Sequence, residues 1–366
     1  MVQTFSSHAI APAAVLRGEG AWAEALPRIR ALCSGPLVLG RSRSTSKLRH
    51  KLLADLNAAG LNPTSAQLQF DCCDHDLERL SLEAQGSDAV IAAGGGKVLD
   101  AGKLLAYRLS IPCITVPLSA STCAGWTALS NIYSPEGAFE SDVALNRCPD
   151  LLVFDHALVR QAPSRTLASG VADALAKWYE ASVSSADSGD GLVQQAVQMA
   201  RVLRDQLLID SPTALQDCNS AAWVRTAEAC ALTAGVMGGL GGARCRTVAA
   251  HAVHNGLTQL PSCHNALHGE KVGFGILVQL RLEERIGGNR LAAQAHRQLL
   301  PLLRQLGLPV CLEDLGLAQA SLSQLQQVCS FACREGSDLH HLPFAVTPGA
   351  LLEALVGAAE PSPLHS

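Results

Sequence analysis

The sequence predicts a two-domain α/β protein, in which a parallel, doubly wound sheet is followed by a helical domain. The chain has 366 residues, more than one compact core usually holds. Short apolar segments alternate with helical patterns up to about residue 160, and long amphipathic segments follow. We therefore expect an α/β domain over residues 1–160 and a helical domain over residues 161–366, with a ligand cleft between them.

Four apolar segments, each bounded by turn residues, predict buried strands of the sheet. They are PLVLG (36–40), DAVIAAGGG (88–96, ending in the glycines), IPCITVP (111–117) and DLLVFD (150–155). The segment KVLDAGKLLAYRL predicts a helix between the second and third strands. In the second half, SGVADALAKWYEASVSS and DGLVQQAVQMARVLRDQLL repeat apolar residues every three or four positions, which is typical of amphipathic helices.

Composition excludes several classes of partner. A net charge of −4 and a pI of about 6.3 provide no positive field for nucleic acid or anionic membranes. The weakly polar stretch 230–243 is too short to span a bilayer, and the first twenty residues lack the pattern of a secretory signal. We expect a cytoplasmic protein whose thirteen scattered cysteines are mostly reduced and buried.

Three glycines at the end of the second predicted strand indicate a phosphate site. Gly94, Gly95 and Gly96 precede a helix, so their backbone can approach a pyrophosphate while the helix N-terminus directs N–H groups at it. The segment GGGKVLD matches neither GxGxxG nor a Walker A loop, so a structural turn remains an alternative. If the site is functional, Lys97 is expected to contact a phosphate and Asp100 a ribose or the nicotinamide amide.

The end of the first predicted strand bears on the choice of cofactor. Gly40 stands where NAD-selective folds often carry an acidic residue, and Arg41, Arg43 and Ser44 follow it. Guanidinium groups match the geometry of a phosphate. We therefore expect NADP(H) to be preferred over NAD(H), the alternative being that these arginines only face solvent.

The segment RTVAAHAVHNGLTQLPSCHNALHGEK contains four of the twelve histidines within eighteen residues. His251 and His254 share a helical face, and His268 follows a loop that can fold back toward them, while His264 lies within that loop. Imidazoles converging in this way favour a metal site, and a carboxylate completes a zinc or ferrous site that keeps an open position. Asp173, in an alanine- and leucine-rich helix, is the candidate carboxylate unless it faces solvent.

Taken together, several motifs resemble the iron-containing alcohol dehydrogenase superfamily, in its glycerol dehydrogenase branch. They are GGGKVLDAGK, VPLSAST, ALSNIYSPEG, GVADALAKWYEA, AAHAVHNGLT and HGEKVGFGILVQL, in the same order and at similar spacings. The resemblance implies an N-terminal Rossmann-like domain, an all-α C-terminal domain and a metal ion in the cleft between them.

The resemblance also implies which residues form the site. Asp173, His251 and His268 would be the metal ligands, with His254 a neighbouring or substrate-side residue. Gly95, Gly96, Lys97 and Asp100 would hold the cofactor, joined by others from the segment that follows the third strand: Leu118, Ser119, Ser121, Thr127, Leu129 and Tyr133.

One residue departs from the glycerol dehydrogenase pattern. That branch carries an aspartate for the polyol in a turn STDA, whereas this chain has Cys123 in STCA. A thiol cannot accept two strong hydroxyl hydrogen bonds, and the lost carboxylate would have repelled an acidic substrate. The segments STCAGWTALS and GVMGGLGGARCRTVAAHAVHNGLT are similar to those of hydroxycarboxylate dehydrogenases, which reduce 2-oxo acids with NADPH.

These observations predict a metal-dependent NAD(P)-linked oxidoreductase that interconverts a small 2-oxo acid, ketone or aldehyde with the corresponding hydroxy compound. We expect one divalent metal ion, zinc with iron or nickel as alternatives, and a homo-oligomer of unspecified symmetry. The alternatives are a glycerol or other polyol dehydrogenase, a 3-dehydroquinate synthase-like lyase, and a catalytically silent nucleotide-binding protein. A dense lysine and arginine set, which the phosphorylated substrate of that lyase needs, is not evident around residues 244–271.

Overall fold

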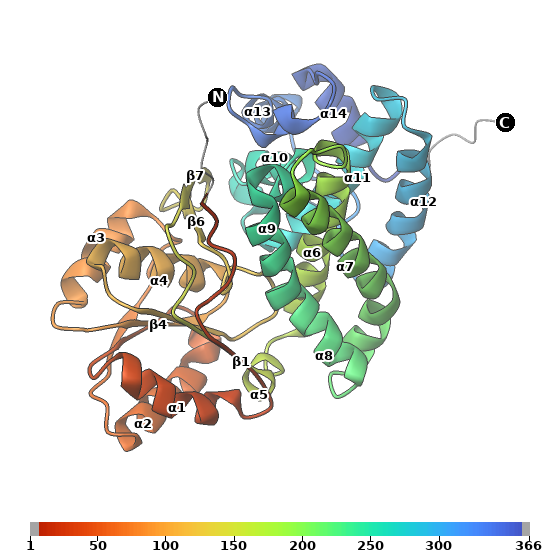
Figure 1. Cartoon of the computed structure of the whole chain (residues 1–366). Coiled ribbons are helices and arrows are strands. Elements are labelled where there is room, and N and C mark those ends of the chain that lie inside the picture. The colour runs from red at the N-terminus through yellow and green to blue at the C-terminus, as the bar shows by residue number, and fades with distance from the viewer. Residues whose placement is uncertain (1–6, 361–366) are drawn as a thin grey trace, which may run out of the picture.

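The computed structural model describes residues 7–360, without the side chains of residues 243 and 244, and contains the predicted parallel sheet followed by helices (Figure 1). Six parallel strands are ordered β1-β8-β5-β4-β2-β3. Their bounds are β1 Val15–Gly18, β2 Leu37–Gly40, β3 Thr64–Gln67, β4 Val90–Gly94, β5 Cys113–Pro117 and β8 Leu151–Asp155. The predicted fold class is confirmed, and β1 and β3 are strands that the sequence analysis missed.

Helices cover both faces of the sheet, as a doubly wound fold requires. On one face α1 (Ala21–Leu32) and α2 (Ser46–Ala58) pack on apolar side chains of β2, β4, β5 and β8. On the other face α3 (Asp74–Glu83) and α4 (Gly96–Leu109) pack on the alternate residues of β2, β4 and β5. Burial on both faces explains why these strands are continuously apolar in sequence. An antiparallel hairpin, β6 (Leu129–Tyr133) and β7 (Phe139–Ala144), follows β5.

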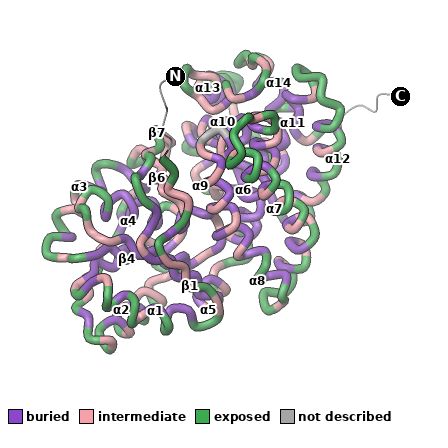
Figure 2. Tube along the Cα trace, viewed as in Figure 1, coloured by how far each residue is buried: buried purple, intermediate pink, exposed green. Residues whose placement is uncertain are grey.

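After β8 the described chain is helical, and its buried side chains form a core that also includes Leu152 and Phe154 of β8 (Figure 2). No helix in the described part is long and apolar enough to cross a membrane. The α-helices are α5 His156–Val159, α6 Ser164–Ser184, α7 Gly191–Gln216, α8 Ala221–Glu228, α9 Ala234–Arg246, α10 Ala249–Leu257, α11 His268–Arg285, α12 Arg290–Gln305, α13 Leu322–Ala332 and α14 Pro348–Val356. Short turns of other helix types are η1 Arg43–Thr45, η2 Ala229–Thr233, η3 Pro261–Cys263, η4 Glu313–Leu315 and η5 Asp338–His341. The proposed boundary near residue 160 stays a prediction.

Glycines let α11 lie unusually close to two other helices. A β-carbon at Gly269 would be 1.8 Å from the backbone oxygen of Ser169 on α6, and one at Gly275 would be 2.4 Å from that of Ala250 on α10. Because both obstacles are backbone atoms, no side-chain movement can make room. The amide of Gly269 also donates to Ser169 Oγ at 3.1 Å. These contacts set the spacing of the three helices that carry His268, Asp173 and His251.

The substitution Gly269→Ala tests this spacing. We expect it to lower the free energy of unfolding by about 1–3 kcal/mol, because α11 must move away from α6. Gly349→Ala in the exposed first turn of α14 is the matched control, since its β-carbon would meet nothing closer than 4.0 Å; a change within about 0.5 kcal/mol is expected there. Equal denaturation midpoints for Gly269→Ala and the unmodified protein would show that the close approach imposes no constraint.

Candidate active site

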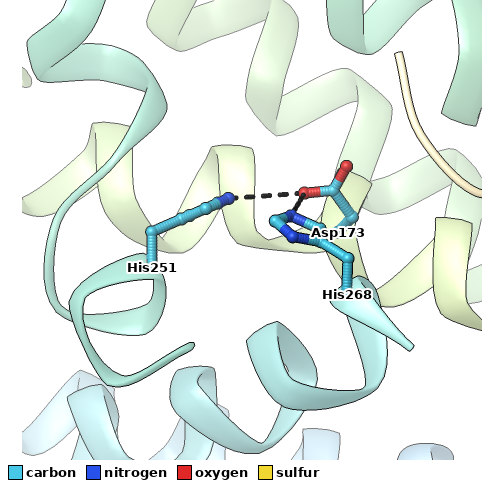
Figure 3. A group of neighbouring side chains, drawn as sticks. All are labelled: Asp173, His251 and His268. Carbon is cyan, nitrogen blue, oxygen red and sulfur yellow. Dashed lines mark ion pairs between the residues drawn. The ribbon is translucent and has the colours of Figure 1, made fainter. Parts of the chain in front are cut away.

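Three ligand-type side chains meet from three helices (Figure 3). Asp173 lies in the middle of α6, His251 in the first turn of α10, and His268 at the start of α11. One carboxylate oxygen of Asp173 lies 3.4 Å from His251 Nε2 and 3.5 Å from His268 Nε2. Each residue offers one ligand atom, and the three atoms all lie within 4.8 Å of one another. Residues separated by almost a hundred positions therefore form one cluster.

The donor set fits a divalent cation. Asp173 is only 3 % exposed, yet its Oδ1 has no hydrogen-bond partner among the described residues. A buried carboxylate oxygen without a partner is costly unless an ion or a charged group compensates it. Burial alone would raise the pKa of Asp173, but Lys177 and the two imidazoles hold that pKa well below its usual range. Two imidazoles and one ionised carboxylate are the ligands of zinc and ferrous sites that leave a coordination position open.

Glu180 fixes the orientation of His251. This fully buried carboxylate lies two turns after Asp173 on α6 and faces His251 Nδ1 at 2.6 Å. Its other oxygen accepts the backbone N–H groups of Val248 at 2.7 Å and His251 at 3.0 Å, which binds the start of α10 to α6. Although burial opposes the charged ring, Glu180 raises the pKa of His251 to about 9. The same negative charge makes Nε2 a stronger donor to a cation.

His268 is positioned by the N-terminus of α11. Glu270 accepts the backbone N–H of Leu267 at 2.7 Å, which closes the first turn of the helix. Arg165, at the start of α6, forms a two-pronged ion pair with the Glu270 carboxylate, at 2.5 and 2.7 Å. This pair joins the first turns of α6 and α11, beside the close contact at Gly269.

His254 lies next to the cluster as a neutral ring. Its centroid is 4.2 Å from that of His268, and its Nδ1 lies 2.9 Å from Asn255 Oδ1. Because the carbonyl oxygen of an amide only accepts, Nδ1 donates there and Nε2 keeps its lone pair. Burial and the neighbouring His268 lower the pKa of His254 well below its ordinary value. The ring can therefore accept a hydrogen bond from a substrate hydroxyl at neutral pH.

The cluster opens into a cavity of about 730 Å³ that extends to the carboxyl ends of β2 and β4. Asp173, His251, His254, His268 and Cys123 all line it. So do most of the cofactor residues expected from the sequence: Arg41, Gly95, Gly96, Lys97, Asp100, Ser119, Ser121, Thr127, Leu129 and Tyr133. The carboxyl edge of a parallel sheet is the usual ligand position in this type of fold.

Some expected residues lie outside the cavity wall. Gly40 and Leu118 are buried, and Arg43 is exposed. His264, the fourth histidine of the segment, instead lies with Nε2 3.0 Å from the backbone oxygen of Thr258. Arg41 reaches the cavity, but it also forms an ion pair with the buried carboxylate of Asp71.

Further charged residues, which the sequence analysis did not assign to the site, organise the cavity. Asp71 also binds Lys97, at 2.5 Å, so the two cations near the glycine loop share one carboxylate. Lys103 pairs with Asp100 at 3.0 Å and donates to backbone oxygens of Thr127 and Leu129 instead of facing a ligand. Glu180 could have been identified from the sequence, because it lies seven positions after Asp173 and hence on the same helical face. Asp71 carries no such local signal.

Comparison with known proteins identifies the family. Residues 12–156 match the model of the iron-containing alcohol dehydrogenase family. Over 292 residues the chain is 35% identical to hydroxycarboxylate dehydrogenase A of Escherichia coli (strain K12), covering 77% of this chain and 78% of that protein. The chain belongs to the iron-containing alcohol dehydrogenase family and is an oxidoreductase of the type that acts on alcohols. This membership favours the dehydrogenase over the lyase and over the silent nucleotide-binding protein.

Two further relatives cover nearly the whole chain. An uncharacterized oxidoreductase of Synechocystis sp. is 52% identical over 359 residues, which is 97% of this chain and 92% of the relative. A crystal structure of a probable glycerol dehydrogenase from Sinorhizobium meliloti 1021 superimposes with a TM-score of 0.84 at 29% identity, covering 97% of this chain and 98% of that one. The family implies NAD(P) and a divalent metal ion as cofactors, which agrees with the cavity and the ligand cluster.

The role of Glu180 can be measured without turnover. We expect Glu180→Gln to weaken the affinity for Zn²⁺ by about 10- to 100-fold, because the charge behind His251 is lost while its ring stays in place. Competition with a chromophoric chelator measures this affinity. The control is Glu283→Gln, a buried glutamate on α11 that bonds Gln279 and Asn289 instead of a ligand. The idea fails if both variants bind the ion as tightly as the unmodified protein.

Proposed function

We propose that the protein is a metal-dependent NADP(H)-linked dehydrogenase that interconverts a small 2-oxo acid and its 2-hydroxy acid. The observation that carries the proposal is the cluster of Asp173, His251 and His268 in the same cavity as the glycine loop at the end of β4. A divalent cation in the cluster would polarise the substrate oxygen, and a nicotinamide would carry the hydride. Hydroxycarboxylate dehydrogenase A is among the relatives, which supports this substrate class.

The residues of the chain supply position and charge. The open N-terminus of α4 at Gly95 and Gly96 offers backbone N–H groups to the pyrophosphate, with Lys97 beside them. Ser119, Ser121, Thr127 and Tyr133 line the same cavity and would orient the nicotinamide half. His254 Nε2 is one candidate for holding the substrate proton, and the alternatives are a ribose hydroxyl of the cofactor and a water molecule at the ion. Asp173 and His251 are buried, so His268 is the most exposed of the three candidate ligands.

Cys123 favours an acidic substrate. Burial raises the pKa of its thiol, so the residue is uncharged at neutral pH. It lines the same cavity as the cluster, in the segment between β5 and β6, and places no carboxylate there. A polyol dehydrogenase remains the second candidate, because the structure from Sinorhizobium meliloti 1021 is of a probable glycerol dehydrogenase.

A substrate panel tests the reaction. The protein, loaded in turn with zinc, iron or nickel, is given 2-oxo acids or aldehydes with NADPH, and polyols with NADP⁺, while absorbance at 340 nm is followed. We expect the largest kcat/KM for a 2-oxo acid. His268→Ala should abolish metal binding and turnover together, because it removes one of three ligands. Activity that survives complete removal of the metal would contradict the scheme.

The cofactor preference is tested at the end of β2. Gly40 carries no side chain, so the Arg49 side chain lies across it, and Arg41, Ser42 and Thr45 line the cavity beside it. A β-carbon at Gly40 would be 2.0 Å from Arg49 Cδ, so Gly40→Asp would displace the Arg49 side chain and place a carboxylate beside the part of the cavity where a 2′-phosphate is proposed to bind. We expect the ratio of kcat/KM for NADPH to that for NADH to fall by about tenfold or more, on the scale of one lost charge-assisted hydrogen bond. Equal or better use of NADH by the unmodified protein would rule out the preference.

A further inference from the structure

Arg246, the last residue of α9, lines the cavity from the helical half of the chain. Helix α9 is interrupted at Gly242 (φ 69°, ψ −166°), so the chain changes direction before Arg246. The aliphatic part of Arg246 lies over Gly238, where a β-carbon would be 3.0 Å from Cδ and 3.2 Å from Cγ. Gly238 and Arg246 both line the cavity, together with Cys123 and Asp173. Two glycines thus give the half-buried Arg246 its path to the cavity wall.

Arg246 differs from the other cations that line the cavity, because its side chain has no ion pair, hydrogen bond or ring contact within the described part of the chain. Lys177 Nζ is 3.6 Å from the carboxylate of Asp173, and Arg41 and Lys97 share Asp71. Arg334 stacks on Phe331, 3.6 Å from the ring centroid. Among residues 7–360, side chains 243 and 244 aside, no carboxylate lies within ion-pair distance of Arg246. A guanidinium group that lines a cavity without a counter-charge can bind an anionic ligand.

The charge of Arg246 acts where the substrate would lie. Burial raises the pKa of the Cys123 thiol, while Lys177 and Arg246 both oppose that rise. Arg246, Cys123 and Asp173 all line the same cavity. The cavity wall thus combines a guanidinium group with an uncharged thiol and the candidate metal ligands.

We propose that Arg246 binds the carboxylate of the substrate and makes the cavity selective for short 2-oxo acids over neutral carbonyl compounds of the same size. The inference rests on the proposed dehydrogenase function and names the residue that selects its substrate. A planar guanidinium group can donate two parallel hydrogen bonds to a carboxylate, which places the adjacent carbonyl carbon in a defined position. The 2-oxo oxygen, on the carbon next to the carboxylate, would then face the cluster of Asp173, His251 and His268.

A matched pair of substrates isolates this role. Pyruvate and hydroxyacetone have similar size and share a methyl ketone, but only pyruvate carries a carboxylate. We expect Arg246→Met to lower kcat/KM for pyruvate by about 10- to 100-fold, mainly through KM, and to change that for hydroxyacetone by less than about threefold. Arg246→Lys keeps the positive charge but cannot donate two parallel hydrogen bonds. Its kcat/KM for pyruvate should lie between those of the unmodified protein and Arg246→Met. Arg201→Met, at an exposed position of α7, is the control and should leave both substrates unaffected.

Binding of oxamate, a non-reducible analogue of pyruvate, provides a readout independent of turnover. Calorimetry with the zinc- and NADPH-loaded protein should show oxamate binding that Arg246→Met weakens by at least about tenfold. The assignment of Arg246 would be overturned if Arg246→Met bound oxamate as tightly as the unmodified protein and lost as much kcat/KM for hydroxyacetone as for pyruvate. Absence of any NADPH oxidation by the unmodified protein would instead refute the proposed function, and oxamate binding would still decide the role of Arg246.

Discussion

The candidate site depends on how the negative charges of two buried carboxylates on one helix are compensated. Asp173 and Glu180 lie on the same face of α6 and are both almost inaccessible to solvent. Neither can stay ionised without cationic or N–H partners, because burial of an isolated charge is very costly. Lys177 and the two imidazoles surround Asp173, while His251 and two backbone amides surround Glu180. Helices α10 and α11 therefore have to meet α6 in one arrangement.

Close helix packing makes this arrangement rigid. The glycines of α11 bring its backbone against α6 and α10, and the pair of Arg165 and Glu270 joins the first turns of α6 and α11. Ligand side chains that project from packed helices hold their geometry better than side chains on loops. The sheet contributes differently, through the open backbone at the end of β4 and the first turn of α4. One half of the molecule thus offers backbone N–H groups to a cofactor, and the other offers side chains to an ion and a substrate.

Charge is distributed unevenly along the cavity. Near the glycine loop, Lys97 and Arg41 share the carboxylate of Asp71, so part of their charge is already compensated. Elsewhere in the cavity, Cys123 is uncharged and Arg246 has no ion pair with the described carboxylates. A carboxylate-bearing substrate would restore the balance there, whereas a polyol would leave the guanidinium group with neutral partners. The proposed selectivity therefore rests on charge: a carboxylate-bearing substrate compensates the positive charge of the guanidinium group, and a polyol does not.

Local patterns in the sequence determined the buried strands β2, β4, β5 and β8, the glycine turn and the amphipathic helices, because these depend on the periodicity of neighbouring residues. They did not reveal β3, a partly exposed edge strand of sequence TSAQ, or β1, whose partner β8 lies more than a hundred residues away. Resemblance to a family directed attention to Asp173, His251 and His268. Only the tertiary structure decided that Glu180 lies behind His251, that Arg41 pairs with Asp71, and that Arg246 passes over Gly238 into the cavity. Periodicity shows which face of a helix a side chain occupies, whereas its partner on a distant segment is set by packing.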